Sequence, residues 1–154
     1  RKPHEAVDYG ILNLEKCFDG IENANVEKIT HICCGYPDKL DAADYPKAPL
    51  NSYHKIAKIL DDSILDTISI EDAHRHNDLN LLEKLKKTKI ILGLIKIASS
   101  VEETINEIQM RVAQALNHID PNQLIAAPDC GLGHLPRNLA KKKLKKMVEA
   151  VKKY

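Results

Sequence analysis

The chain has 154 residues, of which 44% are hydrophobic and 29% are charged, and its formal net charge is +1. These values are typical of one globular domain, and they exclude a chain whose overall charge directs it to nucleic acid or to a membrane surface. The sequence contains no stretch of about 18 uncharged apolar residues and no hydrophobic signal segment at its start. We therefore expect a cytoplasmic protein that has neither a membrane nor a nucleic acid as its partner.

The cysteines bear on the compartment and on metal binding. The four cysteines are Cys17, Cys33, Cys34 and Cys130. In a chain without secretory features we expect reduced thiols or metal ligands, and no disulfide framework. The sequence starts at Arg1 without a methionine, which indicates a fragment or a processed product.

Hydrophobic periodicity predicts alternating helices and strands along the chain. We expect helices over residues 3–18, around 53–60, over 78–86, over 101–116 and from 136 onward. We expect strands over residues 28–34, 66–72, 89–97 and 123–131, the last including its terminal loop. Strict alternation predicts an α/β fold of four parallel βα units, as an open doubly wound sheet or as part of a (β/α)8 barrel.

The last two helices carry more detailed expectations. Ser100 and Glu103 form a predicted capping box, with Val101 as the first residue of the apolar face of the helix that follows. In the last helix, the stripe expected to face inward is Ala140, Leu144, Met147, Val148 and Val151. The lysines of this helix are then expected on its solvent face, which argues against a nucleic-acid-binding site.

Four side chains of metal-binding type fall at three predicted strand ends. His31 and Cys33 lie two residues apart on one strand, so both point to the same face of the sheet. Glu71 ends the second strand, and Cys130 follows the fourth. In parallel α/β folds reactive groups gather where strands end, so we expect these four residues to converge as a zinc site.

The charge of this donor set indicates its chemistry. Two thiolates and a carboxylate more than neutralise Zn²⁺, which makes the ion a poor activator of water. An electron-rich zinc ion is suited to binding an incoming thiol, lowering its pKa and leaving its sulfur nucleophilic toward an alkyl group. The donor set therefore predicts S-alkylation.

Each of these residues also has a simpler interpretation. A His-x-Cys pair at a strand end is commonly part of the core, Glu71 is suited to a helix cap or an ion pair, and residues 129–131 are suited to a turn. We expect Cys34, which points to the opposite face from Cys33, and also Cys17 to be core residues. A redox pair of Cys33 and Cys34 is a further alternative, but adjacent cysteines on a strand form a disulfide only with strain.

Polar residues next to the strand ends are candidates for supporting roles. Residues 71–78 read EDAHRHND. We expect Asp72, His74 and His76, together with Asp129, to contact the substrate or to support the metal ligands. The alternative is a solvated loop whose last residues cap the next helix.

Four segments, in this order, carry a family resemblance: THICCGYPD, SIEDAHRHND, LGLIKIASSVEETINEIQMRVAQAL and LIAAPDCGLGHLPRNLAKKKLKKMVEAV. Together they resemble the C-terminal half of the catalytic barrel of the cobalamin-independent methionine synthase family. The resemblance implies that residues 1–154 are the C-terminal half of a single (β/α)8 catalytic domain, and hence a truncated fragment.

The same resemblance implies a metal and a reaction. It implies that His31, Cys33, Glu71 and Cys130 bind the catalytic zinc ion. It further implies transfer of a methyl group to homocysteine, which yields methionine, from a donor such as 5-methyltetrahydropteroyltriglutamate.

Some segments differ from the classical members of the family. Residues 96–100 read Lys-Ile-Ala-Ser-Ser where the classical enzymes carry a histidine motif for proton transfer, and residues 72–74 and 133–135 differ as well. These differences resemble the shorter single-domain branch, which includes archaeal methionine synthases and epoxyalkane:coenzyme M transferases. The alternatives are therefore alkyl transfer to another thiol such as coenzyme M, or a non-catalytic zinc-binding fragment.

Half a barrel also implies a partner. Four strands bent as in a barrel leave two unpaired edges and one open side of the core. Besides a small-molecule thiol and a methyl donor, we therefore expect the missing N-terminal half of the barrel, or a second copy of the chain, as a partner. The alternative is that the four strands flatten into an open sheet.

Overall fold

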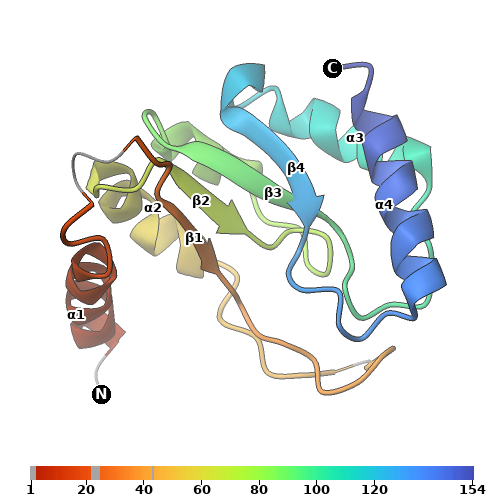
Figure 1. The fold of residues 1–154 in the computed structure, drawn as a ribbon, viewed down its shortest axis with the longest axis horizontal. Helices are drawn as coiled ribbons and strands as arrows, with labels where there is room; N and C mark the ends of the chain where they lie inside the picture. The colour runs from red at the N-terminus through yellow and green to blue at the C-terminus, as the bar shows by residue number, and fades with distance from the viewer. Residues whose placement is uncertain (1–2, 22–24, 43) are drawn as a thin grey trace.

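A computed structural model describes the chain except for residues 1–2, 22–24 and 43. The four strands form one sheet. Figure 1 shows the strands side by side, with helices in the connections between them. The elements are α1 (Pro3–Lys16), β1 (Ile29–Ile32), α2 (Ser52–Asp62), β2 (Thr67–Ile70), η1 (Leu79–Lys84), β3 (Lys89–Ile95), α3 (Ile105–Ala115), η2 (Pro121–Gln123), β4 (Leu124–Pro128) and α4 (Arg137–Val151).

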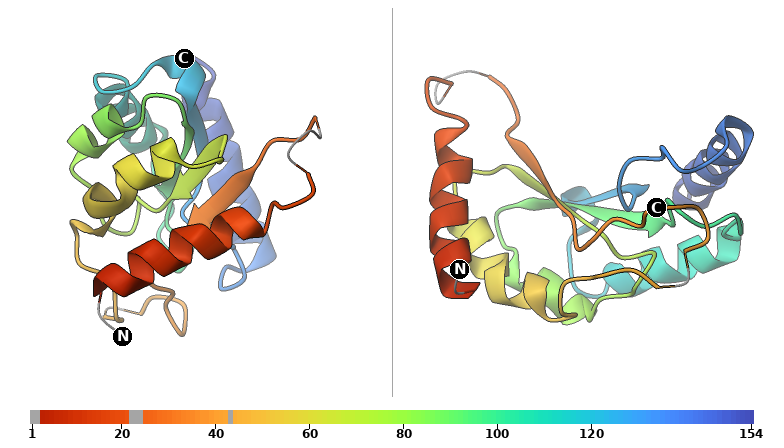
Figure 2. Two further views of the ribbon diagram at one scale, coloured as in Figure 1. Left: turned by 90° about the vertical axis from the view of Figure 1, so that its left-hand side faces the viewer. Right: turned by 90° about the horizontal axis from the view of Figure 1, so that it is seen from below.

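The strands pair in the order of the sequence, and every pair is parallel. His31 is aligned with Ser69 and Ser69 with Ile91, so side chains at these positions share one face of the sheet. Figure 2 shows α2, η1 and α3 along one side of the sheet, with α1 beyond the β1 edge and α4 beside the β4 edge. The predicted α/β fold with four parallel strands is confirmed.

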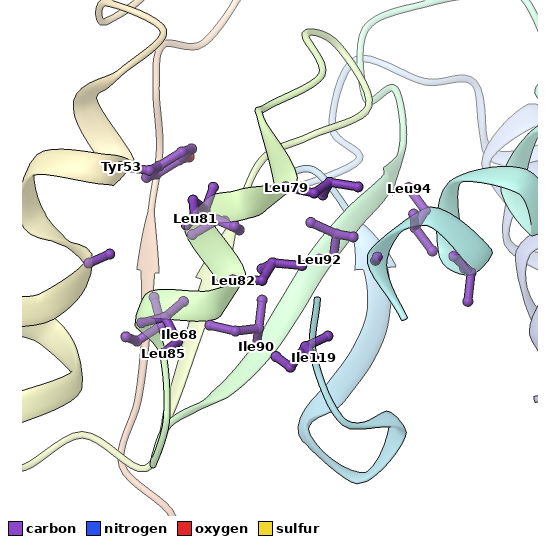
Figure 3. Close-up of a cluster of buried hydrophobic side chains, with 14 of the residues drawn as sticks. Tyr53, Ile68, Leu79, Leu81, Leu82, Leu85, Ile90, Leu92, Leu94 and Ile119 are labelled. Carbon is purple, nitrogen blue, oxygen red and sulfur yellow. The ribbon is translucent and has the colours of Figure 1, made fainter. Parts of the chain in front are cut away.

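The hydrophobic core lies between the sheet and the helices on that side. Ile68, Ile90 and Leu92 point from β2 and β3 toward the helices, and each is at most 1% exposed. Figure 3 shows these side chains packed against leucines of η1, including Leu81 and Leu82. Burial of each such side chain stabilises the fold by about 1.5–3 kcal/mol, so this layer fixes the strands that carry the site.

The opposite face of the sheet is largely open in this chain. Ile29 of β1 is 47% exposed and Ile125 of β4 is 39% exposed. These residues lie on the same face as His31 and Ile91, as the strand register requires. Because parallel sheets are normally covered on both faces, the exposed isoleucines indicate a surface suited to a further layer.

Helix α3 begins later than the sequence predicted. Its capping box is formed by Thr104 and Glu107, each accepting a hydrogen bond from the other's backbone N–H. The prediction of Ser100 and Glu103 is therefore wrong, and Val101 lies outside the helix with 72% of its surface exposed. Ser100 N–H instead donates to Asp41 Oδ1. The Glu103 carboxylate has other partners, which include Lys143.

Helix α4 packs on a stripe that matches the predicted one in part: Met147 is buried, and Leu144 and Val151 pack against the core. Lys143 is fully buried, whereas Val148, which was predicted to face inward, is 51% exposed. The Lys143 ammonium donates to Lys96 O at 3.0 Å and to Glu103 Oε1 at 3.2 Å. Because the ammonium has these partners, a lysine occupies the inward position that the pattern assigned to apolar residues alone.

Among the described residues, every helix is too short or too polar to cross a lipid bilayer.

Candidate metal centre

Four potential ligands converge at the carboxyl ends of the strands. His31 lies in β1 and Cys33 directly follows that strand, Glu71 directly follows β2, and Cys130 follows β4 by two residues. One ligand atom from each of these side chains lies within 4.8 Å of those of the other three. The structure thus brings together all four residues that the sequence singled out as metal ligands.

Hydrogen bonds orient two of these side chains. The Cys33 thiol donates to Glu71 Oε1 at 2.8 Å, and His31 Nδ1 lies 2.9 Å from Ser69 Oγ. A hydrogen bond at one ring nitrogen fixes the imidazole orientation and leaves the other nitrogen for a ligand role. His31 and Cys33 are exposed and Glu71 is buried, so the cluster is accessible from one side.

The electrostatics of the cluster without a metal favour a protonated thiol. Burial, followed by the hydrogen bond to Glu71, raises the pKa of Cys33 to about 12. A metal ion reverses this preference, because its positive charge favours the thiolate and the carboxylate together. Binding of a metal at this position therefore has to release the proton that Cys33 and Glu71 share.

The donor set fits zinc. Two sulfurs, one imidazole nitrogen and one carboxylate oxygen match the ligand types of tetrahedral zinc sites. Bond lengths of about 2.0–2.3 Å place neighbouring ligands on such an ion about 3.3–3.8 Å apart. The four atoms lie within 4.8 Å of one another, which is close to this spacing.

Tyr53 of α2 ties together the strand ends that carry three of these residues. Its hydroxyl donates to Ile32 O at 2.7 Å and accepts from Glu71 N–H at 3.0 Å. The side chain is only 3% exposed, so the bridge is held within the core. The sequence predicted only a helix around residues 53–60, because no local signal separates a bridging tyrosine from a core aromatic.

The loop that follows β1 reaches the segment that follows Cys130. Tyr36 donates from its hydroxyl to Gly131 O at 3.1 Å, and its ring lies 5.0 Å from that of His134. His134 Nε2 in turn lies 2.8 Å from Pro37 O. These contacts hold the two cysteine-bearing segments together at the sheet edge.

The remaining predicted site residues have different surroundings. Asp72 is fully buried and bonds Arg111 of α3, with Nη2 at 2.7 Å from Oδ1, so its carboxylate is directed toward that helix. His74 is half-buried, and its Nε2 accepts from Ala98 N–H at 3.2 Å. His76 is exposed and lines a cavity of about 190 Å³ beside α3.

Asp129 is almost completely buried and bonds the segment that follows Glu71. Its carboxylate accepts the backbone N–H groups of residues 72, 73 and 74 at 2.7–2.8 Å. Burial raises its pKa to about 6, against the opposing effect of these three hydrogen bonds.

The other two cysteines lie outside the cluster. Cys34 is half-buried and packs against the hydrophobic core. Cys17 is exposed, and its thiol donates to Asn13 O in its own segment. The prediction of Cys17 as a core residue is therefore wrong.

The chain is thus an α/β protein with a parallel sheet, and imidazole, thiol and carboxyl groups at its strand ends form a candidate metal site. A profile for the catalytic domain of cobalamin-independent synthases matches residues 50–153. The chain therefore belongs to the cobalamin-independent synthase family.

Similar proteins include members of the short branch of this family. A methionine synthase from Pyrococcus abyssi is 33% identical over 103 residues, which are 66% of this chain and 30% of that protein. A 2-hydroxypropyl-CoM lyase from Xanthobacter autotrophicus is 27% identical over an alignment that covers 97% of this chain and 46% of the relative. The chain thus spans less than half the length of these relatives.

The fold also matches a solved structure. A B12-independent methionine synthase from Shewanella sp. W3-18-1, in complex with selenomethionine, superposes with a TM-score of 0.80 at 28% identity. The match covers 97% of this chain and 45% of that protein. The four βα units therefore correspond to part of the larger fold.

Proposed function

We propose that His31, Cys33, Glu71 and Cys130 bind one Zn²⁺ ion, and that this site serves the methylation of a thiol, with homocysteine as acceptor and methionine as product. The observation that carries the proposal is the convergence of four zinc-type ligand atoms within 4.8 Å of one another. The family of the chain supports it, since relatives that share the fold are methionine synthases.

The residues of this chain prepare the site in three ways. Ser69 orients the His31 ring, and Tyr53 holds the strand ends that carry Cys33 and Glu71. Cys33 and Glu71 give up their shared proton when a cation takes its place. A zinc ion bound by two thiolates and a carboxylate would lower the pKa of a thiol substrate and leave its sulfur electron-rich.

The proposed reaction is a displacement at carbon. The substrate sulfur, deprotonated in the site, forms a bond to the methyl carbon of the donor, and the bond between that carbon and the donor breaks. The bonding electrons remain with the donor, which takes up a proton from water. The segment at residues 96–100 contains no imidazole, so proton transfer in the site does not involve a histidine from this segment.

A second candidate is alkyl transfer to coenzyme M. The similarity to the 2-hydroxypropyl-CoM lyase, which extends over 97% of the chain, favours it. Both candidates share the zinc-thiolate chemistry and differ in the thiol. A zinc-binding piece without activity of its own is the third possibility, because the chain spans less than half of each relative.

We further propose that residues 1–154 correspond to the C-terminal half of a (β/α)8 domain and that the N-terminal half, or a second copy, covers the open sheet face. The exposed Ile29 and Ile125, at the two edge strands of this face, support the proposal. The two thiolate ligands also favour a reducing compartment, in agreement with the expected cytoplasmic location.

The test is a zinc titration followed by a thiol titration. We expect one Zn²⁺ per chain, with binding strongly weakened in Cys33→Ser and Cys130→Ser and unchanged in Cys17→Ser, because Cys17 lies outside the cluster. On the zinc-loaded protein, homocysteine should bind with release of about one proton near neutral pH, whereas homoserine, which lacks the sulfur, should not. Coenzyme M in place of homocysteine separates the two candidates.

Two results would contradict the proposal. The first is equal zinc affinity of the parent chain and both cysteine variants of the cluster. The second is release of no proton with either thiol when zinc is bound.

A further inference from the structure

The convergence of the four ligands poses a geometric problem. Neighbouring strands lie about 4.8 Å apart, so β4 lies roughly 9.5 Å from β2 and roughly 14 Å from β1. The sheet order places β3 between β2 and β4, yet β3 contributes no side chain to the described cluster. Cys130 can approach Glu71 and Cys33 only if the chain after β4 crosses over the end of β3.

Asp129 makes this crossing. Its Oδ1 accepts the N–H groups of Asp72 at 2.7 Å and Ala73 at 2.8 Å, and its Oδ2 accepts that of His74 at 2.7 Å. The three donors directly follow Glu71, and the acceptor directly precedes Cys130. The carboxylate therefore joins the segments of two ligands that belong to non-adjacent strands.

Gly93 of β3 leaves the space for this contact. A Cβ atom at this position would lie 2.0 Å from Asp129 Oδ1 and 2.8 Å from Asp129 Cα, which is closer than non-bonded atoms approach. The pairing of β3 with β4 is irregular at the same point, between Gly93 and Ile95, and Asp129 N–H donates to Ile95 O at 3.0 Å. A glycine within a buried strand is typical of such a close approach.

We propose that Asp129 is a positioning residue of the candidate metal site: with Gly93, it sets the distance of Cys130 from Glu71 and Cys33. This inference rests on the proposed zinc site for its function. Asp129 is 1% exposed, and its carboxylate accepts three hydrogen bonds. The carboxylate is therefore not available to contact a substrate.

The chain offers a matched control in Asp61. This aspartate is 4% exposed, and its Oδ1 accepts from Lys87 N, Thr88 N and Thr88 Oγ1 at 2.9–3.0 Å. These bonds join α2 to the segment directly before β3, at the opposite end of the strands from the cluster. Asp61→Asn and Asp129→Asn thus remove a similar buried carboxylate, but only the second touches the ligand segments.

The first readout is the zinc dissociation constant, measured by competition with a chromogenic chelator. We expect Asp129→Asn to raise it about 10–100-fold, as is usual for residues that support metal ligands, and Asp61→Asn to leave it within about twofold. Gly93→Ala should weaken zinc binding as well. The effects of Gly93→Ala and Asp129→Asn should be less than additive, because both act on one contact.

The second readout needs no metal. This experiment uses metal-free protein carrying Cys17→Ser and Cys34→Ser, in which diamide oxidises the thiols of Cys33 and Cys130 to a disulfide. Each thiol loses one proton and one electron. Diamide takes up the two protons and two electrons and becomes a hydrazine. Mass spectrometry follows the bridging of Cys33 and Cys130. We expect Asp129→Asn to lower the rate of disulfide formation several-fold and Asp61→Asn to leave this rate unchanged.

This second readout separates position from charge. Loss of the negative charge at Asp129 favours the thiolates and, by itself, accelerates bridging, so slower bridging reports a larger distance between the sulfurs. Circular dichroism confirms that each variant is folded under the assay conditions.

The outcomes distinguish this inference from the proposed function. If the parent chain binds zinc and Asp129→Asn changes neither zinc affinity nor bridging, or if Asp61→Asn has the same effects, the positioning role is wrong and the metal site stands. If the parent chain binds no zinc but Asp129→Asn slows bridging, the positioning role stands and the metal site is wrong.

Discussion

The Cys33 thiol donates a hydrogen bond to Glu71 Oε1 over 2.8 Å, so one proton lies between two side chains from neighbouring strands. The same two side chains are proposed ligands of one metal ion. Zinc binding has to displace this proton, so zinc affinity should rise with pH.

Glu71→Gln should make Cys33 more reactive in the metal-free protein. Burial and then the contact with Glu71 raise the pKa of Cys33 to about 12, so little thiolate is present near pH 8. An uncharged amide removes the carboxylate's repulsion of the thiolate, which lowers this pKa. We expect alkylation by iodoacetamide at pH 8, in the presence of a chelator, to be several-fold faster at Cys33. The exposed Cys17 provides the internal reference rate, and an unchanged or slower ratio of Cys33 to Cys17 labelling would argue against the assignment.

Lys143→Met should strongly destabilise the fold. The ammonium is fully buried between Lys96 O and the Glu103 carboxylate, which is itself 12% exposed. Removal of one partner from a buried ion pair typically costs about 3–5 kcal/mol, because the other charge remains without compensation. Urea unfolding measures this loss. Lys145→Met, at an exposed position of the same helix, should change the free energy of unfolding by less than about 0.5 kcal/mol. Equal effects of the two substitutions would exclude the role given to Lys143.

His74→Gln should reduce the loss of stability in acid. Burial, with smaller effects of Lys47, Lys96 and Lys143, lowers the pKa of His74 to about 4, and its Nε2 accepts from Ala98 N–H. The unfolded chain takes up this proton near pH 6.5, so the stability that His74 contributes is full above that pH and is lost as the pH falls toward 4.

A glutamine at position 74 accepts the same hydrogen bond without titrating. As the pH falls from 7 to 5, the free energy of unfolding should therefore decrease more for the parent chain than for His74→Gln. Asp129 titrates in the opposite direction over part of this range, but it is present in both proteins and its contribution cancels in the difference. A difference that is constant with pH would show that His74 is not held neutral.

The sequence was sufficient for the order of the elements and for the convergence of the four strand-end side chains. Alternation of strands and helices predicts parallel strands, and the side-chain period of two places His31 and Cys33 on one face. Since the carboxyl ends of parallel strands share one edge, Glu71 and Cys130 follow on the same side. These are local rules, which a single sequence contains.

Tertiary contacts decided the features that the sequence did not predict. The segment SSVEETINE contains three capping-box patterns, which begin at Ser99, Ser100 and Thr104. The contacts of Glu103 with Lys96 N–H and Lys143 leave Thr104 and Glu107 to cap α3. In α4 the fully buried residues are Lys143, Met147 and Ala150, Leu144 is partly buried against the core, and Val148 is exposed.

The contacts that position the candidate site could not be predicted from local sequence patterns either. Asp129 and Glu71 belong to segments separated by β3, and nothing in the order of residues shows that a carboxylate crosses this strand. The one local signal was Gly93, a glycine inside an otherwise continuous apolar strand, which is typical of a close approach by another part of the chain.

The most direct test of the central claim is X-ray absorption spectroscopy at the zinc edge on the purified chain after loading with Zn²⁺ and removal of excess metal. Binding by His31, Cys33, Glu71 and Cys130 predicts one zinc ion per chain, with two sulfur ligands at about 2.3 Å and two nitrogen or oxygen ligands at about 2.0–2.2 Å. A chain that retains no zinc, or a spectrum without sulfur in the ligand shell, would contradict the claim.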